Sequence, residues 1–124
     1  MKFEIVVAAL LATACGASYP VPTQRMADAQ SAHRSARELG AEKDPSAQLY
    51  LKLAEDQIAK AATMLKDDEN RRADFVLIRA KADAELALAL AREQKSKVEA
   101  QTATAAASSQ ANTNANTNAT QGAQ

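Results

Sequence analysis

The residue with the most distinctive chemistry in this sequence is its only cysteine, Cys15. It follows an apolar run, Ile5–Ala12, and two small residues, Thr13 and Ala14. The run is shorter than the ~20 residues that cross a bilayer, but it matches the roughly 7–15 apolar residues of a secretory signal. Because a signal peptidase admits small side chains before the cut, the pattern predicts a signal over residues 1–14 that is removed just before the cysteine.

This stretch, Leu-Ala-Thr-Ala-Cys over Leu11–Cys15, resembles the lipobox of bacterial lipoproteins. The resemblance implies that the Cys15 sulfur receives a diacylglycerol, that the signal is removed and that the new amine is acylated. Two or three acyl chains such as palmitate would anchor a small protein firmly, since each buried CH₂ contributes about 0.8 kcal/mol. Gly16 rather than Asp after the cysteine implies sorting to the outer membrane, with the folded part facing the periplasm.

Two other interpretations of this segment stay open. Cleavage after Ala14 or Ala17 would release an ordinary secreted protein. Its lone cysteine would then be an unpaired thiol or would form an intermolecular disulfide. A cytosolic protein with a buried N-terminal helix is the third interpretation.

The remaining polar residues do not form a pattern that catalysis needs. His33 is the only histidine, and a general base or metal ligand requires an orienting partner, so we expect a solvent-facing or boundary position. The acids over 67–69 do not match a calcium loop and are typical of a helix start. Four basic residues interleave with acids, which favours a solvated mixed-charge face over a lipid-phosphate site: Arg71, Arg72, Arg79 and Lys81. The sequence predicts no enzyme, no metal and no cofactor.

Composition narrows the partners further. The 124 residues carry 15 Lys+Arg and 15 Asp+Glu, so the net positive charge that attracts nucleic acid is absent. Aromatic residues are 3% and Trp is absent, which argues against stacking platforms for bases. Gly-rich phosphate loops are excluded by only 3 glycines. We therefore expect no nucleic-acid partner and identify no small-molecule substrate.

The sequence predicts three helices, over 23–39, 45–66 and about 69–100. Any functional side chain of the central region would be positioned by them. Asp44 and Pro45 suit the N-cap and first position of the second helix, and Gly40 suits the end of the first. Small and apolar residues recur at spacings of three and four, which predicts one buried face per helix. These residues are Met26, Ala29, Ala32, Ala36 and Leu39; Leu51, Ala54, Ile58, Ala61 and Leu65; and Ala73, Leu77, Ala80, Ala84, Ala87 and Ala91, flanked by Phe75, Val76 and Leu88.

Short loops between these helices predict an all-α, antiparallel three-helix bundle with a long third helix. Its coiled-coil-like seam is mostly alanine, which buries little apolar area, so we expect marginal stability and association with a second copy or an envelope protein. Tyr50 and Phe75 are the only aromatic residues of the bundle. We expect both to plug its core; the alternative is that they anchor an interface.

Two segments flank the predicted bundle. Residues 15–22 include two prolines that disfavour helix, which predicts an extended tether after the cysteine. Residues 101–124 carry no charge and no large apolar side chain, and they contain a small Asn-Thr-Ala repeat. Such a segment buries too little surface to offset the entropy of ordering, so we expect a disordered Ala/Asn/Thr/Gln-rich tail.

Residues 23–100 resemble the DUF4398 family of bacterial envelope domains. The resemblance rests on Ala27–Ala32, Leu53–Ala61 and Ala80–Ala87, three alanine-rich segments that fall one on each predicted helix. It implies an alanine-rich lipoprotein, and it supplies no catalytic residues. Some relatives carry a peptidoglycan-binding OmpA-like module. Here a polar tail follows instead, so that attachment is not carried over.

The sequence thus predicts a non-enzymatic bacterial envelope lipoprotein, a helical scaffold or interaction module anchored in the outer membrane through Cys15. The alternative is a periplasmic chaperone-like or adaptor protein that binds client or partner helices.

Overall fold

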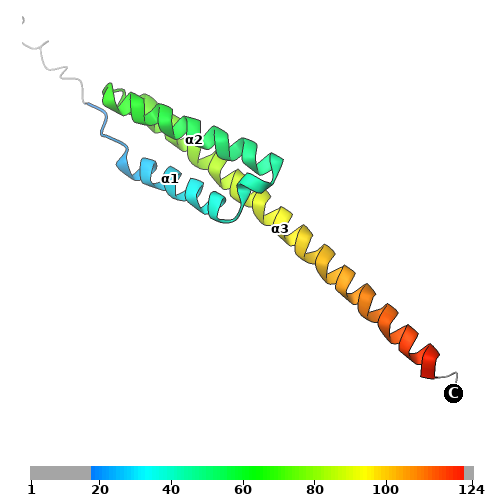
Figure 1. Ribbon diagram of the computed structural model, residues 1–124. Helices are drawn as coiled ribbons and strands as arrows, with labels where there is room; N and C mark the ends of the chain where they lie inside the picture. Colours follow the sequence, from blue (N-terminus) through cyan, green and yellow to red (C-terminus); the bar gives the residue numbers. More distant parts are fainter. Residues whose placement is uncertain (1–17, 122–124) are drawn as a thin grey trace, which may run out of the picture.

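A computed structural model of the protein describes the chain from Ser18 to Gln121, and its side chains as far as Asn116. This part contains three α-helices and no strand (Figure 1): α1 (Thr23–Glu38), α2 (Pro45–Lys66) and α3 (Asn70–Gln121), with a short 3₁₀ turn, η2 (Ala41–Lys43), between the first two. The predicted all-α, three-helix architecture with a long third helix is confirmed. The predicted signal and Cys15 lie outside the described residues.

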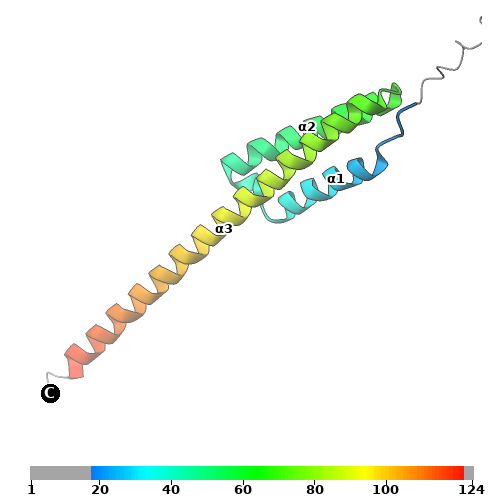
Figure 2. The same ribbon diagram turned by 180° about the vertical axis from the view of Figure 1, so that it is seen from behind.

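The three helices form a bundle in which α3 is the central element. Both α1 and α2 pack mainly on α3 and touch each other much less. The two views in Figures 1 and 2 agree that both shorter helices lie along the first half of α3, and that the second half extends beyond them. The bundle therefore occupies one end of an elongated molecule.

Local signals set the ends of the helices as expected. The Asp44 carboxylate accepts a hydrogen bond from the Ala47 amide at 2.8 Å, and Pro45 fills the first position of α2. Gly40 has φ +90°, a left-handed conformation in which an L side chain would be strained. Helix α1 ends at Glu38, one residue before the predicted end, because this glycine turns the chain into η2.

The predicted stripe of α3 is the centre of the bundle, and we term it the alanine seam. All six of its residues are buried: Ala73, Leu77, Ala80, Ala84, Ala87 and Ala91. Around it lie two small clusters of buried residues, to which α2 adds Ala47 and Met64 beyond the predicted set. Leu77 is the one large side chain of the described chain that is fully buried. The core is therefore thin, as the alanine content predicts.

The predicted disorder after residue 100 is wrong for residues 101–121, which continue α3. Every residue from Arg92 to Asn116 is exposed, so this extension has no tertiary core, as expected. A helix needs none once it has been nucleated, because each further residue adds a backbone hydrogen bond, and alanine has the highest helix propensity. Hydroxyl groups bond to the preceding turn, as in Thr102 to the Val98 carbonyl at 2.8 Å.

We expect Leu77→Ala to lower the free energy of unfolding by about 3 kcal/mol, because it leaves a cavity where two helices meet α3. Urea denaturation followed by circular dichroism measures the change. Leu49→Ala is the matched control, since Leu49 is 57% exposed on α2 and its loss should cost below about 1 kcal/mol. Equal losses for the two variants would contradict a core centred on the seam.

Ala106→Pro tests the extension of α3. Proline removes a backbone donor and breaks a helix interior, so the helical signal per residue should fall. The urea midpoint of the bundle should not change, because the last buried residue of α3 is Ala91. A helical signal equal to that of the wild type would show that residues around 106 are not helical in solution.

Candidate functional site

The two aromatic residues that were predicted to plug the core differ in their burial. Tyr50 is half-buried and packs against the cluster that contains Leu51 and Ala87, so it lies at the edge of the core, and its role in an interface stays a prediction. Phe75 is 56% exposed, and its prediction as a core residue is wrong. It lies two residues from Ala73, which at about 100° per residue places it on the far side of α3 from the alanine seam. The role of Phe75 in an interface stays a prediction.

His33 occupies a boundary position, as expected. It is half-buried in a shallow hollow between α1 and α2 that is lined by Gln30, Arg34, Glu55 and Ile58. Partial burial lowers its pKa below 6.5, so the imidazole is neutral at pH 7. Among the described residues, no three His, Cys, Asp or Glu side chains are arranged to hold a metal ion.

The mixed-charge face around the N-terminal turns of α3 is also present. Arg72 forms an ion pair with Glu69 at 2.6 Å, and Lys81 forms one with Glu85 at 3.6 Å. Exposed pairs of this kind contribute little to stability. Within residues 18–121 no helix is long and apolar enough to span a bilayer.

The most organised polar group of the described chain surrounds Asp74, which is its one buried charged residue. Tyr19, from the segment before α1, donates its hydroxyl proton to Asp74 Oδ2 at 2.8 Å. The Arg25 guanidinium, on the first turn of α1, forms an ion pair with Asp74 Oδ1. One carboxylate on α3 therefore holds both the N-terminal segment and the start of α1. Its burial is compensated because both of its oxygens have partners.

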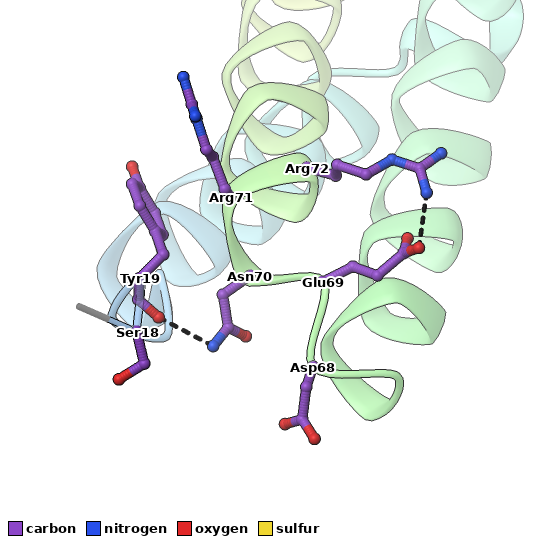
Figure 3. A pocket seen from close by; sticks show the side chains of 7 residues that line it. All are labelled: Ser18, Tyr19, Asp68, Glu69, Asn70, Arg71 and Arg72. Atoms are coloured by element: carbon purple, nitrogen blue, oxygen red, sulfur yellow. Dashed lines mark hydrogen bonds and ion pairs between the residues drawn. The ribbon is translucent and has the colours of Figure 1, made fainter. Parts of the chain in front are cut away.

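A second contact holds the backbone of the same segment. Asn70, the first residue of α3, donates its side-chain amide to the Tyr19 carbonyl at 3.0 Å (Figure 3). Figure 3 also shows Arg71 and Arg72 directed to opposite sides of α3, with Arg72 turned toward Glu69. We term Tyr19, Arg25, Asn70 and Asp74 the N-terminal clamp.

The clamp changes the interpretation of residues 18–22. They are non-helical, as the two prolines predict. They do not form a free spacer, however, because Tyr19 is bonded through both its side chain and its backbone to α3. Sequence reasoning missed this contact because 55 residues separate Tyr19 from Asp74. The only feature of the sequence that could have indicated the clamp was the position of Asp74, an acidic residue next to Ala73 of the alanine seam.

The side chains of the clamp hold parts of the chain in position. Tyr19 and Arg25 occupy both oxygens of the Asp74 carboxylate, and the Asn70 amide holds the Tyr19 carbonyl, so each of these groups is engaged in a contact within the clamp. In the described helices we find no arrangement of side chains that would support catalysis. The clamp fixes Tyr19 and the start of α1 onto the N-terminal turns of α3.

Comparison with protein families gives a match for the bundle. The model of a family described as a domain of unknown function, DUF4398, covers residues 24–103. This span includes α1 except for Thr23, all of α2 and about two thirds of α3, and it ends within the exposed extension. No curated protein and no solved structure matches the chain.

The clamp predicts a pH dependence. The hydrogen bond to Asp74 raises the pKa of Tyr19 above 10.0, with smaller contributions from desolvation and from the Asp74 charge. Since the folded-state pKa is raised, Tyr19 stabilises the fold in full below pH 10, and this contribution is lost as pH rises through the raised pKa. In a Tyr50→Phe background, the phenolate absorbance of Tyr19 measures the pKa directly.

Asp74→Asn removes the charge and should return the pKa of Tyr19 toward 10.0. Tyr19→Phe should make the unfolding midpoint fall less steeply at alkaline pH; the remaining fall comes in part from Lys52 and Lys97, whose pKa values are raised by neighbouring carboxylates. A Tyr19 titration that Asp74→Asn leaves unchanged would show that the clamp is open in solution.

Proposed function

We propose that this chain, which belongs to the DUF4398 family, is a non-enzymatic lipoprotein of the bacterial envelope. Cys15 carries the lipid and anchors the protein in the outer membrane, and the helices face the periplasm as a scaffold or interaction module. The lipobox-like sequence Leu11–Cys15 supports the anchor. The absence of catalytic arrangements in the described helices supports the non-enzymatic role.

The N-terminal clamp is the observation that carries this proposal. Tyr19 lies only four residues after Cys15. Four extended residues reach about 14 Å at most. A lipid on Cys15 would therefore hold the clamp, and with it the α2–α3 end of the bundle, close to the membrane surface. A lipoprotein would gain a defined orientation at the membrane from an N-terminal segment that is docked in this way.

The direction of α3 determines which end of the molecule would lie near the membrane. In Figure 1 the segment before α1 and the α2–α3 turn lie at one end of the molecule, and the C-terminal end of α3 lies at the other. At 1.5 Å per residue, the 52 residues of α3 extend about 78 Å. Anchoring at Cys15 would therefore hold this end of the bundle at the membrane surface, with the far end of α3 up to about 78 Å from the anchor.

The surface of the bundle suits binding to other helices. Large apolar side chains are exposed on the outer face of α2 and on the outer face of α3, and exposed apolar residues that gather on one helix face mark interaction sites. These residues are Leu49, Leu53, Phe75, Ile78 and Leu86. The same residues favour the second candidate function, a periplasmic chaperone-like or adaptor protein that binds client or partner helices.

Metabolic labelling with palmitate tests the anchor. We expect the wild-type chain to incorporate label and to fractionate with the outer membrane, and Cys15→Ser to lose both properties. Cys15→Ser/Ser31→Cys is the matched control: it places the thiol after Asp28, Ala29 and Gln30 and should stay unlabelled, because no lipobox-like run of small residues precedes it. Label retained by Cys15→Ser would refute lipidation at this residue.

Crosslinking in the envelope followed by affinity capture separates the two candidate roles. A scaffold or interaction module should recover a small, reproducible set of partners. Recovery of many unrelated unfolded proteins would favour the chaperone-like role.

A further inference from the structure

A row of exposed apolar residues runs along the face of α3 that points away from α1 and α2. It comprises Phe75, Ile78, Ala82, Leu86 and Ala89, and we term it the outer stripe. Its three large side chains are 56%, 42% and 40% exposed, in chain order. The spacings of three and four place all five residues about 180° around α3 from the alanine seam. Nothing in the described chain covers this face.

The outer stripe is symmetric about Ala82. Phe75 and Ala89 lie seven residues to either side of it, and Ile78 and Leu86 lie four residues to either side. Two copies of α3 packed antiparallel across a two-fold axis at Ala82 would therefore bring Phe75 against Ala89 and Ile78 against Leu86. Large side chains would meet small ones at the ends, and two alanines at the centre would let the helices approach closely.

Charges at the ends of the stripe have the same symmetry. Arg71 and Glu93 lie eleven residues to either side of Ala82, both exposed and both on the outer side of α3. An antiparallel pair would place Arg71 of one copy beside Glu93 of the other at each end. A parallel pair would place Arg71 beside Arg71 and Glu93 beside Glu93, which like-charge repulsion disfavours. Among residues 18–121, Arg71 forms no ion pair, and Glu93 pairs with Lys97 of its own helix through Oε1 at 2.7 Å, which leaves Glu93 Oε2 to Arg71 of the other copy.

The rest of the bundle leaves room for this pairing. Helix α1 reaches α3 on the flank of Asp74, and α2 reaches it on the opposite flank, where Gln57 donates a hydrogen bond to Asp83. Both flanks border the alanine seam, so neither shorter helix covers the outer stripe. In a pair, the two copies of α3 would lie back to back at the centre, with α1 and α2 outside.

We infer that the outer stripe binds a second copy of this chain in an antiparallel, two-fold arrangement centred on Ala82. This inference names the partner of the proposed interaction module, and in that respect it rests on the proposed function. It does not depend on the lipid, so the failure of palmitate labelling and the failure of pairing are separate results.

Disulfide crosslinking of the full chain tests the arrangement. Cys15→Ser removes the native thiol, and a single cysteine is introduced at Ala82, Ala89 or Ala59. Ala82→Cys should form a disulfide-linked dimer rapidly, because the two copies of residue 82 meet at the axis. Ala89→Cys is matched in residue type and face, but its two copies would lie about 21 Å apart along the helices and should not link. Ala59→Cys, exposed on α2, reports random collision.

Two results would overturn the inference. If Ala82→Cys links no faster than Ala59→Cys, the outer stripe does not pair. If Ala82→Cys and Ala89→Cys link equally fast, the helices pair in parallel. Adding Ile78→Glu to Ala82→Cys should slow linking at least tenfold by placing a charge opposite Leu86, while the circular dichroism spectrum stays unchanged because Ile78 lies outside the core.

Discussion

The close approach of α1 and α2 to α3 along the alanine seam is the contact on which the rest of the structure depends. Methyl groups let helix axes come near the lower end of the usual 8–10 Å, and alanine favours the helical backbone itself. The same choice limits the hydrophobic contribution, because each alanine removes little apolar surface from water. With Leu77 as the one large, fully buried side chain of the described chain, packing alone leaves α1 weakly held.

The N-terminal clamp adds polar contacts to α1, the helix whose apolar packing is weakest. Helix α1 is the shortest of the three, with 16 residues, and alanines supply its only fully buried positions. Arg25 and Tyr19 bind the start of this helix and the preceding segment to one buried carboxylate on α3. A buried carboxylate whose oxygens lost those partners would be costly, so the contacts reinforce each other. Polar bonds thus fix the position of an element for which apolar burial is insufficient.

Periodicity predicted the buried face of α3 because a helix face depends only on local spacing, and all six residues of the alanine seam are buried. The residue types of Asp44 and Gly40 likewise predicted the start of α2 and the end of α1. Periodicity could not predict the clamp, since nothing local pairs Tyr19 with Asp74. Phe75 was misplaced because aromatic character was given more weight than its angle on α3. The tail was misjudged because a criterion for tertiary folding was applied to a helix whose nucleus the bundle already supplies.

Helix α3 therefore carries three different surfaces along one continuous backbone. Its inner face over 73–91 is the alanine seam, its outer face over nearly the same residues is apolar but exposed, and beyond Ala91 it is exposed on all sides. In a helix that served only as a core element, the outer face would carry charged residues throughout. The apolar outer face instead ends with the bundle, at Ala89, where the two shorter helices also stop supporting α3. The alanine seam and the outer stripe end at nearly the same residues of α3. Packing of α1 and α2 on the seam holds this part of α3 rigid, so the outer stripe on its opposite side is rigid as well.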